Sequence, residues 1–196
     1  MQYIICMQRK IIKEVSEIIA GFTFRGALKS DPDGGMRVLL AKNINEDGTI
    51  SYDDLTKISL EAPRTNAFVS KNDVVLSSRG VFRAGVFSED TNNTITASSV
   101  YILRISVKYI LPKYLAIYLN SKIGQNRIKN ITTGSTVKTI LRGALENLEI
   151  NIPSIDRQKK IIEIMENWQT REKMLVKKIE VSKNITEGAI THLLTN

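Results

Sequence analysis

Cysteine and histidine are almost absent from this chain of 196 residues, which contains one of each, Cys6 and His192. A single cysteine cannot form an intramolecular disulfide or a cysteine-rich metal site, so we expect Cys6 to be a buried apolar thiol in a reducing, cytoplasmic setting. His192 lies four residues before the last residue. We expect it to be solvated near a helix end rather than to belong to a catalytic triad or a metal site.

Sequence motifs of catalysis are also missing. The chain has no G-x-S-x-G, H-E-x-x-H, C-x-x-C or G-x-G-x-x-G pattern, and no N-P-P-[FY] segment of the kind that adenine methyltransferases carry. The close carboxylates Asp53–Asp54 and Asp31/Asp33 lie in expected turns and are interpreted as structural. A metal-dependent nuclease would need several converging acidic residues. The sequence therefore predicts a protein without a catalytic site, metal or cofactor of its own.

Long hydrophobic runs are missing as well. A membrane span needs about 20 apolar residues, and no uninterrupted run approaches that length. The apolar start, residues 1–7, lacks both a preceding basic region and a following small-residue cleavage site. Hydrophobic residues still make up 42% of the chain. We therefore expect a soluble protein with a real core and no membrane partner.

Proline and glycine divide the chain near Pro153, since no proline and only Gly188 follow it. Before this point, turn clusters such as Asp31–Gly35 and Asn45–Gly48 separate short apolar runs, which predicts one mixed α/β domain over residues 1–153. After it, the apolar spacing predicts one long coiled-coil helix over residues 154–196, reaching ~60 Å. Within the domain we expect helices over Ile11–Ile19, from Pro112, over Ile123–Ile131 and over Leu141–Leu148, and strands over Met36–Leu40, Val74–Leu76, Val100–Val107 and Leu148–Ile152.

The expected long helix carries an apolar seam at three- and four-residue spacing, formed by Ile161, Met165, Trp168, Leu175 and Ile179. Glu172, Ser182 and Thr186 interrupt the heptad. A lone helix of this length would leave its seam in water, so we expect it to pack against another helix. The alternative is a helix that folds back on its own domain, with a break near Gly188.

The chain carries a net charge of +8, and residues 91–145 contain no acidic residue at all. The eight basic residues of this stretch are Arg104, Lys108, Lys113, Lys122, Arg127, Lys129, Lys138 and Arg142. We expect them to form one positive surface, unopposed by carboxylates, that contacts nucleic-acid phosphates. The alternative is an ordinary solvated basic face.

Two short segments are candidates for contact with DNA. In Thr132–Thr139, small hydroxyls and a glycine allow close approach to a phosphate, and Lys138 adds a charge. In Ser77–Gly80, followed by Arg83, an arginine at the end of a strand could bind a phosphate or a guanine edge. The alternatives are a turn without a ligand and arginines that pair with local acids such as Asp73 or Glu89.

Several segments, taken in order, resemble the DNA specificity (S) subunits of type I restriction–modification systems. Lys71–Gly80 is similar to the family pattern K-x-G-D-[IV]-L-x-S-x-x-G, with Asn72 in place of the usual glycine. Asp156–Ile161 resembles the E-Q-K-K-I start of the family's long helix. The other segments that carry the resemblance are Ile18–Phe24, Ala41–Ile44, Asp47–Ile50, Leu111–Leu115, Tyr118–Ser121, Gly134–Thr136 and Leu148–Pro153.

The resemblance implies a target recognition domain, a long helix, and double-stranded DNA as ligand. It also implies a methyltransferase (M) subunit that modifies adenine N6 and a restriction (R) subunit, which would bring S-adenosylmethionine, ATP and Mg²⁺. Full-length members usually carry two recognition domains and two antiparallel helices, whereas this chain has one of each. A natural half-subunit, half of a split subunit and a truncated one all fit. The expected DNA contacts are Lys42, Asn43, Ser78, Arg79, Arg83, Ser135, Thr136 and Lys138.

A half-subunit that pairs through its helix would read an inverted site in two parts. Two other functions remain open on the sequence. One is an assembly scaffold or inhibitor that uses the same helix without reading DNA. The other is a stand-alone nuclease, against which the missing ligand cluster argues.

Overall fold

The structure is a computed structural model that describes residues 7–60 and 66–195, so the expectation for Cys6 lies outside the described residues. The chain forms two compact units, Met1–Lys159 and Lys160–Asn196. The long helix α4 (Ile155–Thr195) therefore begins inside the first unit and continues as the second. No helix in the described ranges is both long enough and apolar enough to cross a lipid bilayer.

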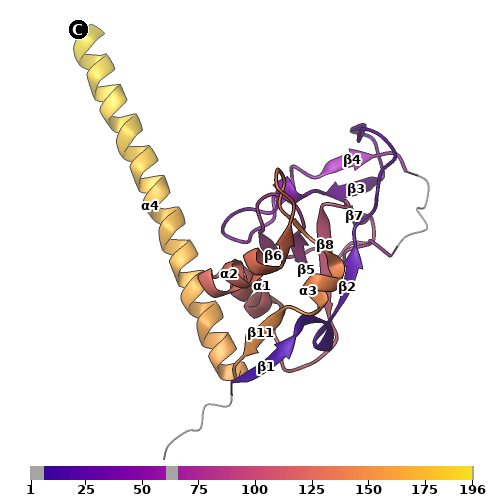
Figure 1. The fold of residues 1–196 in the computed structure, drawn as a ribbon. Helices are drawn as coiled ribbons and strands as arrows, with labels where there is room; N and C mark the ends of the chain where they lie inside the picture. Colours follow the sequence, from indigo (N-terminus) through magenta and orange to yellow (C-terminus); the bar gives the residue numbers. More distant parts are fainter. Residues whose placement is uncertain (1–6, 61–65, 196) are drawn as a thin grey trace, which may run out of the picture. The chain divides into compact units, whose positions relative to one another are not determined.

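A four-stranded antiparallel sheet forms the centre of the first unit (Figure 1), with the strand order β2-β8-β5-β6. The strands are β2 (Ser16–Ala20), β8 (Val100–Ile105), β5 (Val74–Ser77) and β6 (Ala84–Val86). All four residues of β5 are buried. β5 thus has no solvent-exposed face, which explains why Val74, Val75 and Leu76 are apolar in succession rather than alternating with polar residues.

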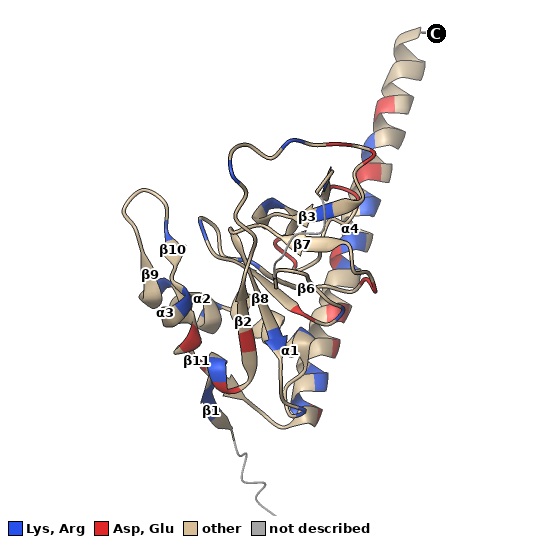
Figure 2. Cartoon of the chain, turned by 90° about the vertical axis from the view of Figure 1, so that its right-hand side faces the viewer, with Lys and Arg blue, Asp and Glu red and all other residues tan. Residues whose placement is uncertain are grey.

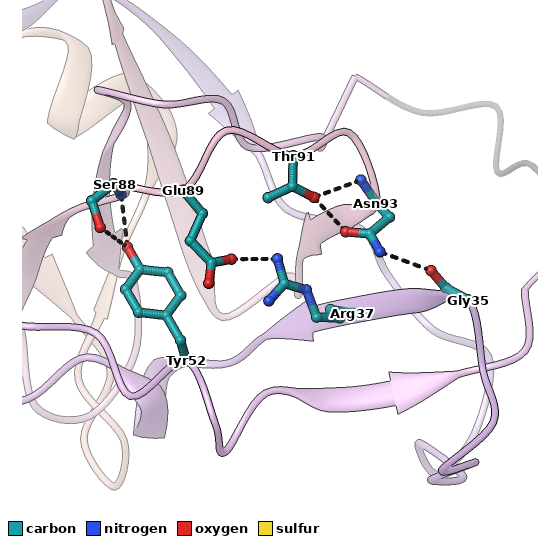
Figure 3. A network of polar contacts seen from close by, with 7 residues as sticks. All are labelled: Gly35, Arg37, Tyr52, Ser88, Glu89, Thr91 and Asn93. Atoms are coloured by element: carbon teal, nitrogen blue, oxygen red, sulfur yellow. Dashed lines mark hydrogen bonds and ion pairs between the residues drawn. The ribbon is translucent and has the colours of Figure 1, made fainter.

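A second sheet has the order β4-β3-β7, with β3 (Met36–Leu39) antiparallel to β4 (Thr56–Ile58) and parallel to β7 (Thr94–Thr96). Polar contacts fix the segment before β7 to this sheet (Figure 3). Arg37 of β3 forms an ion pair with Glu89, and Asn93 Nδ2 donates to Gly35 O at 3.1 Å. Glu89 is therefore the partner of Arg37 and not of the arginines in the candidate DNA segments.

Helices α1 (Pro112–Asn120) and α2 (Lys122–Ile131) pack beside β6, as Figure 1 shows. The last residue of α1, Asn120, closes the edge of the sheet. Its Oδ1 accepts from Ala84 N at 2.8 Å, and its Nδ2 donates to Ala84 O at 2.8 Å. The amide thus satisfies an edge-strand residue as a neighbouring strand would, which gives the family-like segment Tyr118–Ser121 a structural role.

The remaining elements are short. β1 (Gln8–Ile11) pairs with β11 (Glu149–Ile152), and β9 (Thr132–Thr133) pairs with β10 (Thr139–Ile140), both antiparallel. α3 (Arg142–Glu146) lies between β10 and β11, and two 3₁₀ turns cover Ile12–Glu14 and Ala41–Asn43.

Most expected elements are confirmed, including the helix that begins at Pro112 and the uninterrupted long helix, which has no break at Gly188. The helix expected over Ile11–Ile19 is wrong. This segment contains the end of β1, a 3₁₀ turn and β2, whose residues pair with β8. It is rich in β-branched residues, which favour strands, and pairing with the central sheet overrides its helical spacing.

Among the described residues, Asn72 is the only non-glycine residue with a positive φ, 71°, and it stands where the family pattern quoted above has a glycine. This left-handed conformation costs ordinary residues about 1–2 kcal/mol, and asparagine less. We expect Asn72→Gly to leave the free energy of unfolding nearly unchanged and Asn72→Val to lower it by about 1–2 kcal/mol. Urea unfolding measures both, with Lys71→Val as the control at the neighbouring exposed position. Equal effects of the valine at both positions would contradict this account.

Candidate nucleic-acid interface

The strands β9 and β10 form a hairpin whose loop, residues 134–138, holds most of the hydroxyl-rich segment. Gly134 starts this loop with a φ of 97°, and a Cβ atom there would lie 2.3 Å from Val137 O. Only glycine fits such a position. Ser135, Thr136 and Lys138 follow, and all three are exposed.

The hairpin is hydrogen-bonded to the turn that joins β5 to β6, residues 78–83. Gly80 N donates to Lys138 O at 2.9 Å, and Ile140 N donates to Ser78 O at 2.9 Å. Arg79 forms a β-bridge with Thr139 between these two bonds. The two candidate segments, which lie more than 50 residues apart in the sequence, are therefore parts of one surface, called here the hairpin–turn surface.

Tyr101 of β8 joins the central sheet to this surface, since its hydroxyl donates to Ile140 O at 3.0 Å. Burial raises the pKa of the Tyr101 phenol, and the charges of Arg79 and Arg142 partly oppose this rise. Sequence reasoning missed Tyr101, although a single aromatic residue on a strand with four aliphatic side chains was a usable signal.

The charge on the hairpin–turn surface is positive. Residues 132–140 contain no acidic residue, and Figure 2 shows the hairpin standing out beside the sheets without any acidic position on it. Arg79 and Lys138 are exposed on the two paired segments. Arg142 is paired through its Nε with Glu146 Oε1 at 2.9 Å. Exposed cations beside exposed hydroxyls can bind phosphate oxygens and base edges.

Two expected contact residues are built into the fold instead. Asn43 is 1% exposed, its Oδ1 accepts from Leu40 N at 2.9 Å, and its Nδ2 donates to Asp54 O at 3.1 Å. Ser78 is 2% exposed, and its hydroxyl donates to Ser98 O at 3.3 Å. A DNA contact by either side chain would require breaking these bonds, so we leave both out of the proposed interface.

The other two expected residues are Lys42 and Arg83, the last residue of the turn 78–83. Arg83 forms an ion pair with Glu46, with 2.6 Å between Nη2 and Oε1. Lys42 is exposed on the 3₁₀ turn Ala41–Asn43. Two residues after Lys42, the carbonyl oxygen of Ile44 accepts from Arg83 Nη1 at 3.5 Å. The segment that follows Lys42 therefore contacts Arg83, the last residue of the turn.

The expectation that eight basic residues form a surface unopposed by carboxylates is wrong for Arg104 and Arg142. Arg104 binds Asp73 through two hydrogen bonds, of 3.0 and 2.7 Å, and Arg142 pairs with Glu146. Arg127 donates to Glu149 O at 2.6 Å. Carboxylates thus oppose two of the eight charges, and the Arg127 bond goes to a backbone carbonyl oxygen. DNA contact is therefore expected at the hairpin–turn surface rather than over the whole stretch. The described residues hold no group of three or more potential metal ligands.

Residues 7–181 match the family model of the type I restriction modification DNA specificity domain. The chain belongs to this family. The specificity subunit of the type I restriction enzyme EcoBI from Escherichia coli is 30% identical over 141 residues, which cover 69% of this chain and 29% of that protein. The family resemblance carried by the sequence segments is thereby confirmed.

Solved structures agree with the mixed α/β fold and its long helix. The S subunit of a type I restriction–modification system from M. genitalium superposes with a TM-score of 0.61 at 19% identity, covering 94% of this chain and 44% of that one. A structure concerned with complex assembly and conformational transition of the type I system gives 0.61 at 18% identity, covering 86% and 40%. This specificity-family chain therefore spans less than half the length of these relatives.

Proposed function

We propose that this chain is a non-catalytic DNA-reading subunit that directs a partner adenine-N6 methyltransferase, and a restriction subunit, to a target site. The observation that carries the proposal is the pairing of the hairpin with the turn 78–83, which gathers Arg79, Ser135, Thr136 and Lys138 on one exposed surface. Membership in the specificity family supports DNA as the ligand. S-adenosylmethionine, ATP and Mg²⁺ would belong to the partners.

In this proposal the side chains of the hairpin–turn surface have different roles. Lys138 is a flexible point charge and suits a phosphate, which fixes position but carries no sequence information. Arg79 has a planar fork that suits a phosphate or the O6 and N7 atoms of guanine. Ser135 and Thr136, at the tip of a loop, can donate to or accept from base edges.

The proposal extends to a homodimer that pairs through α4 and reads an inverted site in two parts. The exposed apolar seam supports this arrangement, because Trp168, Leu175 and Ile179 are each more than half exposed. A two-fold axis between two copies would present two identical recognition units in opposite orientations.

Lys138→Ala should weaken binding to all duplex sequences alike and flatten the plot of log affinity against log salt by about 0.9, the value for one lost phosphate contact. Titrations of the full chain with duplex DNA at several salt concentrations measure both quantities. Lys108→Ala is the matched control, since Lys108 is an exposed lysine of the same acid-free stretch outside the hairpin–turn surface. An unchanged slope for Lys138→Ala would contradict the interface.

A further inference from the structure

Arg83 is held rigidly at the end of the turn. Its backbone N donates to Ser77 Oγ at 2.8 Å, and its carbonyl accepts from Ser77 N at 2.9 Å. Its side chain is 29% exposed. The backbone of Arg83 is thus fixed at the base of the β5–β6 turn, the same turn that presents Arg79.

The ion pair between Arg83 and Glu46 is asymmetric. The Glu46 side chain is 85% exposed, on the turn closed by the bond from Gly48 N to Asn45 O. Arg83 has further donors that are poorly used. Its Nη1 reaches Ile44 O at 3.5 Å, the limit of a hydrogen bond, and its buried Nε has no hydrogen-bond partner among the described residues. The backbone of the arginine is fixed in the fold and its side chain is only partly satisfied, while the carboxylate lies on the surface.

A carboxylate and a phosphate present similar oxygens to the guanidinium fork. We propose that Glu46 occupies the place of a DNA backbone phosphate on Arg83 and swings away when DNA binds. This inference rests on the proposed function. The pair acts as a gate because a phosphate that binds Nη2 of Arg83 must first displace Glu46, so the turn holds DNA less tightly than its arginines would allow. An exposed carboxylate that pairs with one arginine is weakly held, which makes the displacement possible.

The gate predicts that Glu46→Gln binds DNA about 5-fold more tightly at low salt, which corresponds to an exposed ion pair of about 1 kcal/mol. This gain in DNA affinity should depend on the guanidinium group of Arg83. In an Arg83→Ala background, and in an Arg83→Lys background that keeps the charge, the same substitution should gain less than about 2-fold. Asp53→Asn is the control for net charge, since Asp53 is an exposed carboxylate in another turn.

The measurement is fluorescence anisotropy with the full chain and a labelled mixed-sequence duplex, in a double-mutant cycle over positions 46 and 83. A gain for Glu46→Gln that equals the gain for Asp53→Asn, or that persists without Arg83, overturns the gate while leaving the proposed function intact. Failure of the unaltered chain and all variants to bind duplex DNA overturns both. Circular dichroism melts of each variant show whether a weakened affinity reflects unfolding.

Discussion

Replacing Leu175 with glutamate should turn a dimer of this chain into monomers. Leu175 is 58% exposed in the single chain, within a seam that also holds Trp168 at 59% and Ile179 at 69%. Water contact of this extent is unfavourable for residues spaced as on one face of a coiled coil. A second α4 that covers the seam removes all of these side chains from water at once.

The expected effect is large because a two-fold dimer contains the substitution twice. Burying one leucine side chain stabilises by roughly 1.5–3 kcal/mol, so two copies lose about 3–6 kcal/mol before any repulsion between the new carboxylates. Since about 1.4 kcal/mol is tenfold in affinity, we expect the dimer to weaken by a factor of at least about 100.

Sedimentation velocity over a range of concentrations measures this dimer. Met174→Glu is the matched control, because Met174 is 66% exposed in the same helical turn but lies off the seam. It should leave the association nearly unchanged. Methylation mapping with the methyltransferase partner adds a second test, since a dimer predicts an inverted repeat. A dimer that survives Leu175→Glu, or that is lost equally in both variants, would contradict pairing through this seam.

Local patterns predicted the elements well and the polar contacts poorly. The spacing of apolar residues was sufficient for α4, and Pro112 marked the start of α1, because both signals lie within the element itself. The strand β2 was mistaken for a helix because its pairing with β8 involves residues that are remote in sequence. A periodic pattern over nine residues cannot reveal such a partner.

The candidate site shows the same difference between signals that lie within a segment and contacts between remote residues. Glycine among small hydroxyls marked Thr132–Thr139 as a candidate contact segment, and its loop is exposed in the structure. Gly134 has the backbone conformation that only glycine readily adopts. Asn43 and Ser78 looked equally suitable as ligands, yet their amide and hydroxyl groups bind Asp54 O and Ser98 O, which are 11 and 20 residues away. Hydrogen-bond partners at such separations follow from tertiary structure, so sequence reasoning cannot separate buried polar groups from exposed ones.

Gln158→Leu should destabilise the first unit more than any surface substitution. Gln158 lies in the first turn of α4, in the segment that resembles E-Q-K-K-I, and is completely buried. Its Oε1 accepts from Leu111 N at 2.8 Å, and its Nε2 donates to Tyr109 O at 2.8 Å and Pro153 O at 2.9 Å. One amide thereby joins the start of α1, the end of β11 and the start of α4.

Leucine has nearly the same volume as glutamine but cannot make these bonds, so the variant separates hydrogen bonding from packing. Each buried group left without a partner costs about 1–3 kcal/mol, and solvent near the half-exposed Tyr109 recovers part of this, so we expect a loss of about 3 kcal/mol. This loss is a large share of the free energy of unfolding of a typical domain, which is only about 5–15 kcal/mol.

Urea unfolding followed by circular dichroism measures the loss, and Gln8→Leu, at an exposed strand position, is the control. Gln158→Glu refines the test. It keeps an acceptor for Leu111 N but turns a carboxylate toward two carbonyl oxygens, and at neutral pH it should cost at least as much as leucine. Unchanged stability of Gln158→Leu would mean that shape alone holds the start of α4 against the recognition unit.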